Sequence, residues 1–192
     1  MFKPIWQFIK GEPLPLDSRH TVRNIIEFGV LVAIWGLMQA LIVFGDWSPL
    51  SLILLLLFVA SGKTLFFGIE NIQQLLSASH HNIPFYKFMM ILFVNMAQLV
   101  LSFALDYHCL HQIDAGSFRG INPELAGASL VFEFFYFSVL SFTFFGYGDI
   151  TPQTIPAKFL TMTEVLVAFA TVIFLLSDFI SLKESVSPEK KP

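Results

Sequence analysis

The residues best suited to chemistry in this chain are Gly146, Tyr147, Gly148 and Asp149, within the stretch SFTFFGYGDITP. Glycine adopts positive φ without a steric penalty, so glycines on both sides of a tyrosine allow successive backbone carbonyls to point the same way. A column of such oxygens can replace the water around a dehydrated cation. The pattern therefore predicts a cation path. No nucleophile, base and orienting group occur together elsewhere, so we expect no enzyme activity.

The composition predicts an integral membrane protein. The chain has 192 residues, of which 55% are hydrophobic and only 13% are charged, and 23 are phenylalanine. A soluble domain of this length has too little interior to hide that much apolar surface. The net charge of −3 argues neither for nor against a nucleic-acid partner, but the lysines and arginines form no basic patch large enough to hold phosphates, so we expect no such partner. We expect a lipid bilayer as the surroundings, and neither a small-molecule substrate nor a cofactor.

Hydropathy predicts the elements that position the cation path. A membrane-spanning helix needs about 20 mostly apolar residues, and four windows qualify: 25–44, 50–69, 88–105 and 157–182. A fifth apolar segment, 128–142, is too short for a comfortable crossing and carries Glu133. We therefore expect an all-α integral membrane protein with four transmembrane helices. We also expect a re-entrant half-helix and a loop between the third and the fourth transmembrane helices.

The predicted organisation has five parts: an N-terminal cytoplasmic or interfacial segment (1–24), a helical hairpin (25–69), a cytoplasmic loop (70–87), a module of two spans around the re-entrant segment (88–182) and a cytoplasmic tail (183–192). Lysine and arginine gather at both ends of the chain and near the 70–87 loop, so both termini are expected in the cytoplasm of a multi-pass protein of the cell membrane. Lys63 is expected to extend to the inner surface.

The first residues fit two interpretations. Phe2, Ile5, Trp6 and Ile9 recur at helical spacing, which suits a short helix lying in the inner interface of the membrane. A disordered tail fits this segment equally well.

The sequence GYGD after SVLSFTFF, followed by ITP and an apolar helix, resembles the pore module of tetrameric potassium channels. The resemblance covers residues 128 to about 182. It implies a homotetramer with four loops around one axis, and K+ as the permeant ion, held by the backbone carbonyls of Phe145, Gly146 and Tyr147. It also implies that Asp149 rings the outer mouth and that the Tyr147 ring packs against the pore helix. Thr143 matches the first threonine of the usual motif.

The chain departs from that motif at three positions. Phe144 stands where the family has a second threonine, whose hydroxyl lines the innermost ion site, and Phe145 stands for valine or isoleucine. Four Phe144 rings would gather at the inner end of the filter, where an apolar constriction can gate by dewetting. Leu140 stands where some members carry a glutamate that bonds the filter aspartate. Asp149 then needs another partner, and the Tyr136 hydroxyl is the candidate.

The resemblance also assigns the fourth span to the inner pore. Four residues would line it: Phe169, Val172, Leu176 and Ile180. Many members bend at a glycine that falls here at Ala168. Asp178 fits either an acidic ring at the inner mouth or an interfacial residue in water. None of the four spans contains arginine, which argues against a voltage sensor.

Polar residues within the spans need partners. Asn95, Gln98 and Ser102 share one helical face and are expected to form helix-to-helix hydrogen bonds. Glu164 is expected to face protein or water, since a charge in lipid is costly. Cys109, the single cysteine, is expected to be a small buried hydrophobe.

Two functions fit these observations. The first is a potassium-channel-like cation channel. The alternative is a non-conducting or weakly selective relative that acts as a regulatory or sensor subunit in the membrane.

Overall fold

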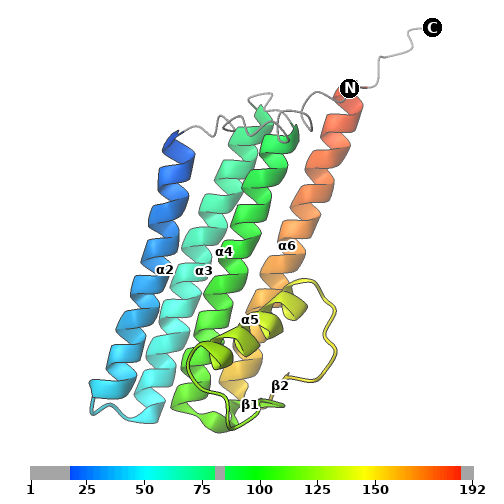
Figure 1. The fold of residues 1–192 in the computed structure, drawn as a ribbon. Coiled ribbons are helices and arrows are strands. Elements are labelled where there is room, and N and C mark those ends of the chain that lie inside the picture. Colours follow the sequence, from blue (N-terminus) through cyan, green and yellow to red (C-terminus); the bar gives the residue numbers. More distant parts are fainter. Residues whose placement is uncertain (1–17, 81–84, 187–192) are drawn as a thin grey trace, which may run out of the picture. The chain divides into compact units, whose positions relative to one another are not determined.

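The computed structural model of the chain describes residues 18–80 and 85–186, with side chains described for 24–69, 89–90 and 92–173. Its long elements are all helical (Figure 1). In chain order, the helices and strands are α2 (Ser18–Phe44), α3 (Pro49–His80), α4 (Phe85–Ile113), η1 (Ala115–Ser117), β1 (Phe118–Arg119), α5 (Ala128–Phe142), β2 (Thr151–Pro152) and α6 (Ile155–Val186). The chain divides into two units, 1–34 and 35–192. The described part of the first is the beginning of α2, and the contacts below belong to the second.

Three helices of the described part are long and apolar enough to cross a membrane, and they match three predicted windows. These stretches are Asn24–Phe44, Pro49–Ile69 and Ile155–Ile173. The predicted window 88–105 lies inside α4, which is equally long but carries polar residues along its length. Helix α5, with 15 residues, coincides with the predicted half-helix at 128–142.

Two helices continue past their apolar windows. Helix α3 runs to His80 and α4 begins at Phe85, so the predicted 70–87 loop is wrong for residues 70–80 and 85–87. Helix α4 ends at Ile113, beyond the predicted window 88–105. Hydropathy measures the length suited to lipid, not the length of the helix. Neither extension contains the glycine or proline that would break a helix.

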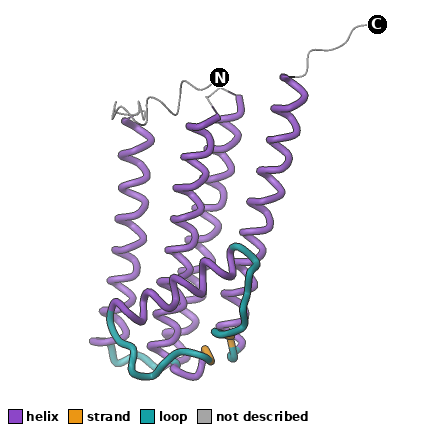
Figure 2. The backbone as a smooth tube through the Cα atoms, turned by 45° about the vertical axis from the view of Figure 1, so that its right-hand side comes forward, coloured by secondary structure: helices purple, strands orange, loops and turns teal. Residues whose placement is uncertain are grey.

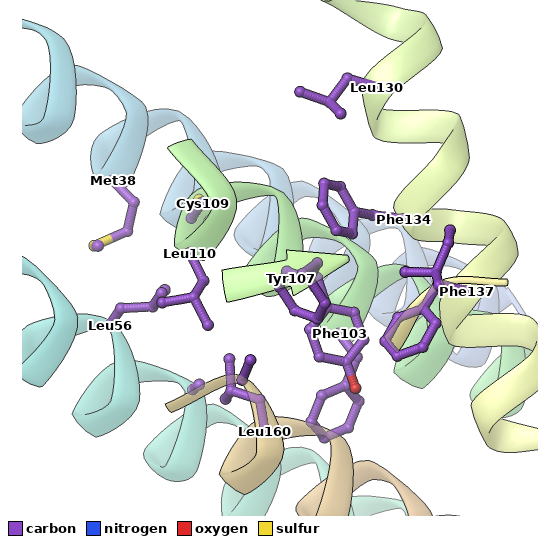
Figure 3. Packing of buried hydrophobic residues seen from close by; sticks show 14 residues of the cluster. Met38, Leu56, Phe103, Tyr107, Cys109, Leu110, Leu130, Phe134, Phe137 and Leu160 are labelled. Atoms are coloured by element: carbon purple, nitrogen blue, oxygen red, sulfur yellow. The ribbon is translucent and has the colours of Figure 1, made fainter. Parts of the chain in front are cut away.

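Aromatic side chains pack α5 against α4 (Figure 3). The Tyr107 and Phe137 rings meet edge to face at 5.1 Å between centroids, and Phe118 meets Phe134 in the same manner at 5.1 Å. Such pairs contribute about 0.5–1.5 kcal/mol beyond the area they bury. Cys109 is buried in the same cluster as a free thiol, as expected.

A two-stranded ribbon joins the ends of the segment that holds α5. Strand β1 pairs antiparallel with β2, with Phe118 opposite Pro152 and Arg119 opposite Thr151. The Gln153 N–H also donates to the Ser117 carbonyl at 2.8 Å. Figure 2 shows that the loop after α5 returns to the ribbon at the beginning of α6. The chain between the strands therefore leaves and re-enters the bundle at one end.

Some predictions fall outside this description. The interfacial helix or disordered tail expected at residues 2–9 lies outside the described residues. Helix α6 continues through Leu176, Asp178 and Ile180, but their side chains are also outside the description.

Candidate cation site at the end of helix α5

Helix α5 ends in a hydrogen-bonded turn that places Phe144 in a left-handed conformation. The Phe145 N–H donates to the Leu140 carbonyl at 3.0 Å, and the Phe144 N–H donates to the Ser141 carbonyl at 3.2 Å. These two bonds define the Schellman motif, in which the residue after the C-cap usually is glycine. Phe144 has φ 61°, the one positive value among the described non-glycine residues. A left-handed non-glycine residue costs about 1–2 kcal/mol.

In the first part of the loop after α5, the backbone donors are occupied and the acceptors are free. The Thr143 N–H donates to the Val139 carbonyl at 3.0 Å, and the Gly146 N–H donates to the Leu140 carbonyl at 3.4 Å. With the two bonds of the Schellman turn, the N–H groups of residues 143–146 all point back to the end of α5. Within the described chain, no hydrogen bond is donated to the carbonyls of residues 143–148. These oxygens are available to an electropositive ligand.

The two glycines of the loop are needed for backbone handedness. Gly146 has φ 34° and Gly148 has φ 79°, and a Cβ atom at either would meet no heavy atom within 4 Å. The aromatic rings next to these glycines, Phe145 and Tyr147, are uncovered in the single chain. Phe145 is 68% exposed and Tyr147 is 71% exposed, with their rings 6.3 Å apart. The Tyr147 ring is therefore not packed against α5 within one chain, and its packing against a pore helix in an assembly stays a prediction.

Asp149, at the end of the loop farther along the chain from α5, has the partner that the sequence suggested. The Tyr136 hydroxyl donates to Asp149 Oδ2 at 2.8 Å, and the Ile150 N–H donates to Asp149 Oδ1 at 2.9 Å. Both bonds stabilise the charged carboxylate, and the bond from Tyr136 is the main reason that the pKa of Asp149 is lowered from its ordinary value of 3.8. The carboxylate keeps its negative charge at neutral pH.

Gly120 holds the backbone of Asp149 from the other side, and sequence reasoning missed it. It has φ 96°, and a Cβ at this position would lie 1.8 Å from the Asp149 carbonyl oxygen. Only glycine fits so close an approach. A single glycine within FRGINP gave no sequence signal for this contact, because residues 120 and 149 meet only through the pairing of β1 with β2.

A buried polar cluster fixes the opposite side of α5. Glu164 of α6 is fully buried, and the Tyr107 hydroxyl of α4 donates to its Oε2 at 2.5 Å. Ser138 of α5 places its Oγ 2.5 Å from Glu164 Oε1 and 2.9 Å from the Val100 carbonyl oxygen of α4. The expectation that Glu164 faces protein or water is confirmed. Three helices meet at this side chain.

A second buried contact joins α3 to α4. Lys63 forms an ion pair with Asp106 at 2.7 Å and donates to the Ser102 carbonyl at 3.3 Å. Lys63 is buried, so the expectation that it extends to the inner surface is wrong. The cause is a carboxylate on the neighbouring helix, which no local pattern reveals. The expected polar face of α4 is buried as well, at Asn95 and Gln98. Among the described residues the Asn95 side chain has no hydrogen-bond partner, so the expected helix-to-helix bond is wrong for Asn95 within one chain.

Helix α6 is continuous from Ile155 to Val186, with no break at the site of the family's glycine. Ala168 is fully buried and packs with Leu99 and Phe142. Phe169 is exposed in the single chain, and Val172 is partly exposed.

Comparison with known proteins identifies the class. A family model described as ion channel matches residues 89–184, which is half of the chain and takes in α5, its loop and most of α4 and α6. The chain therefore belongs to this ion channel family, and its apolar helices make it a membrane protein. No curated protein matches the chain. No solved structure matches it either.

Proposed function

We propose that the chain forms a homotetrameric cation channel in the cell membrane, with both termini cytoplasmic, that conducts K+ through a filter built from residues 143–149. The observation that carries this proposal is the loop after α5. The N–H groups of residues 143–146 are held by the end of α5, while the carbonyls of residues 143–148 accept no hydrogen bond within the described chain. Backbone carbonyls around an axis replace the hydration shell of a cation in selectivity filters.

The surroundings of the loop support the same function. Half-helix α5 enters beside α4 and α6, and its loop returns to the end where it began (Figure 1). The C-terminal end of α5 carries the negative end of the helix dipole, which favours a cation. The exposed rings of Phe145 and Tyr147 leave a surface that neighbouring copies of the chain would cover.

The test is ion flux into vesicles that contain the purified protein. K+ flux above that of empty vesicles is expected, with less Na+ flux. Gly148→Ala should abolish most of it, because φ 79° strains an alanine within the filter. Gly127→Ala is the matched control. Its φ of 57° is also left-handed and its space is also open, but it lies at the N-cap of α5. Flux that Gly148→Ala leaves unchanged would contradict the filter.

The particle itself provides a second measurement. Four copies of the chain are expected in the detergent-solubilised assembly, since one chain supplies a single GYGD loop. A monomeric particle would contradict the proposal even if flux were observed.

Phe144 favours a second candidate, a non-conducting relative that acts as a regulatory or sensor subunit. Its side chain is half exposed at the inner end of the loop, where four rings would form an apolar constriction. Phe144→Gly removes the ring and suits the left-handed backbone, whereas Phe144→Thr removes the ring and keeps the strain. A silent parent protein with flux in both variants would favour this second candidate. Flux in the parent that neither variant raises would contradict the constriction.

A further inference from the structure

The hydroxyl of Ser138 has more acceptors within reach than it has hydrogens. It has one proton to donate, yet its Oγ lies 2.9 Å from the Val100 carbonyl oxygen and 2.5 Å from Glu164 Oε1. If Glu164 were ionised, both of these oxygens would be acceptors only. One of the two short contacts would then set two oxygen lone pairs against each other.

A proton on Glu164 gives each contact one hydrogen. Glu164 Oε1–H then donates to Ser138 Oγ, and the Ser138 hydroxyl donates to the Val100 carbonyl. The Tyr107 hydroxyl donates to Glu164 Oε2, which is the free oxygen of the neutral acid. The chain of hydrogen bonds runs in one direction, and all its members are satisfied.

The surroundings of Glu164 also lack a positive charge. Tyr107 from α4 and Ser138 from α5 are neutral groups. The carboxylate of Asp106 is close enough to act on Glu164, and it forms its own ion pair with Lys63 of α3. Among the described side chains, no lysine or arginine forms an ion pair with Glu164. An ionised carboxyl that is fully buried in an apolar span without a counter-charge is costly.

We propose that Glu164 carries a proton in the folded channel and that, as a neutral acid, it is a positioning residue that ties pore helix α5 to α4 and α6. Ser138 lies five residues before Thr143, on the last turns of α5 before the loop. If Glu164 loses its proton, Ser138 has to give up one of its two contacts, and α5 loses one of its ties. The filter after α5 then loses support at high pH.

Infrared spectroscopy of the purified protein tests the proton directly, whether or not the chain conducts. The carbonyl stretching band of a buried carboxylic acid is expected in the parent protein at neutral pH and absent from Glu164→Gln. Glu133→Gln is the control, because Glu133 is a glutamate of the adjoining helix α5 whose side chain is only partly buried. A parent spectrum without the band would overturn the proposal. So would a band that Glu164→Gln retains.

Flux measured against pH tests the positioning role, and this arm rests on the proposed channel function. Parent flux is expected to fall by more than half as rising pH ionises Glu164. Glu164→Gln should keep its flux across the same range, since its amide can donate to Ser138 and accept from Tyr107. Identical pH profiles in the two proteins would overturn the positioning role. A clear infrared band with no flux in any variant would instead contradict the channel function alone.

Discussion

Two tyrosine-to-carboxyl hydrogen bonds flank helix α5, and they lie in opposite surroundings. On one side Tyr107 donates to Glu164 at 2.5 Å, and both side chains are fully buried among α4, α5 and α6. On the other side Tyr136 donates to Asp149 at 2.8 Å in an exposed part of the loop. The same chemical pair thus occurs once in a buried interior and once in an exposed loop.

The difference between the two bonds is what happens when one partner is lost. A buried carboxyl without its donor has no water to replace it and pays the cost of an unsatisfied polar group. At the exposed bond, water can replace the lost hydroxyl of Tyr136 as the donor to Asp149. The buried bond therefore contributes mainly to stability, and the exposed bond mainly sets the charge of Asp149.

The largest loss of stability is expected from disrupting the buried ion pair between Lys63 of α3 and Asp106 of α4. Lys63→Met leaves Asp106 charged and unpaired in the interior, which is expected to destabilise the protein by about 3–5 kcal/mol. Thermal unfolding of the purified protein measures it. The double variant Lys63→Met with Asp106→Leu is the control and should recover most of the loss. A single variant as stable as the parent would show that this interior is hydrated.

Gly120→Ala disrupts the exposed side in the same way, because Gly120 lies against the backbone of Asp149. The new Cβ would lie 1.8 Å from the Asp149 carbonyl oxygen, and φ 96° strains any residue with a side chain. We expect a loss of about 1–3 kcal/mol and a reduced flux. Gly116→Ala is the control, since it lies in the same connection at an ordinary φ. Equal stability and flux in both variants would contradict the close approach of residues 120 and 149.

Tyr107→Phe tests the buried bond itself. It keeps the ring in the aromatic cluster and removes the donor to Glu164 Oε2, so a loss of about 1–3 kcal/mol is expected. Thermal unfolding again measures the change. No loss of stability would mean that water reaches Glu164, which would remove the contrast between the two sides of α5.

Tyr136→Phe is expected to have the smallest effect on stability and a distinct effect on pH dependence. Losing this hydroxyl raises the pKa of Asp149 toward 3.8, because the bond favours the charged carboxylate. As pH falls, Asp149 would be neutralised earlier, so acid block of flux should begin at a higher pH than in the parent. Titration of flux toward acid pH measures the shift. A shift to lower pH would contradict the assigned partner.

Prediction from the sequence succeeded where a pattern is local. The 128–142 half-helix follows from an apolar run between loop residues, and Tyr136 was identified as the partner of Asp149 because both lie on the same short segment. It failed where partners come from distant segments. Lys63 lies 43 positions from Asp106, and Gly120 lies on the far side of α5 from Asp149 along the chain. The Schellman turn also escaped prediction, because a phenylalanine occupies its glycine position.

By itself, the sequence determined the apolar composition, the positions of the apolar helices and the glycines that give the loop its handedness. Each of these depends on the properties of neighbouring residues and on the period of a helix. Only the tertiary structure decided which buried polar groups meet. Hydrogen bonds and ion pairs act over a few ångströms, and whether Lys63 reaches a carboxylate or the aqueous surface depends on how α3 packs against α4.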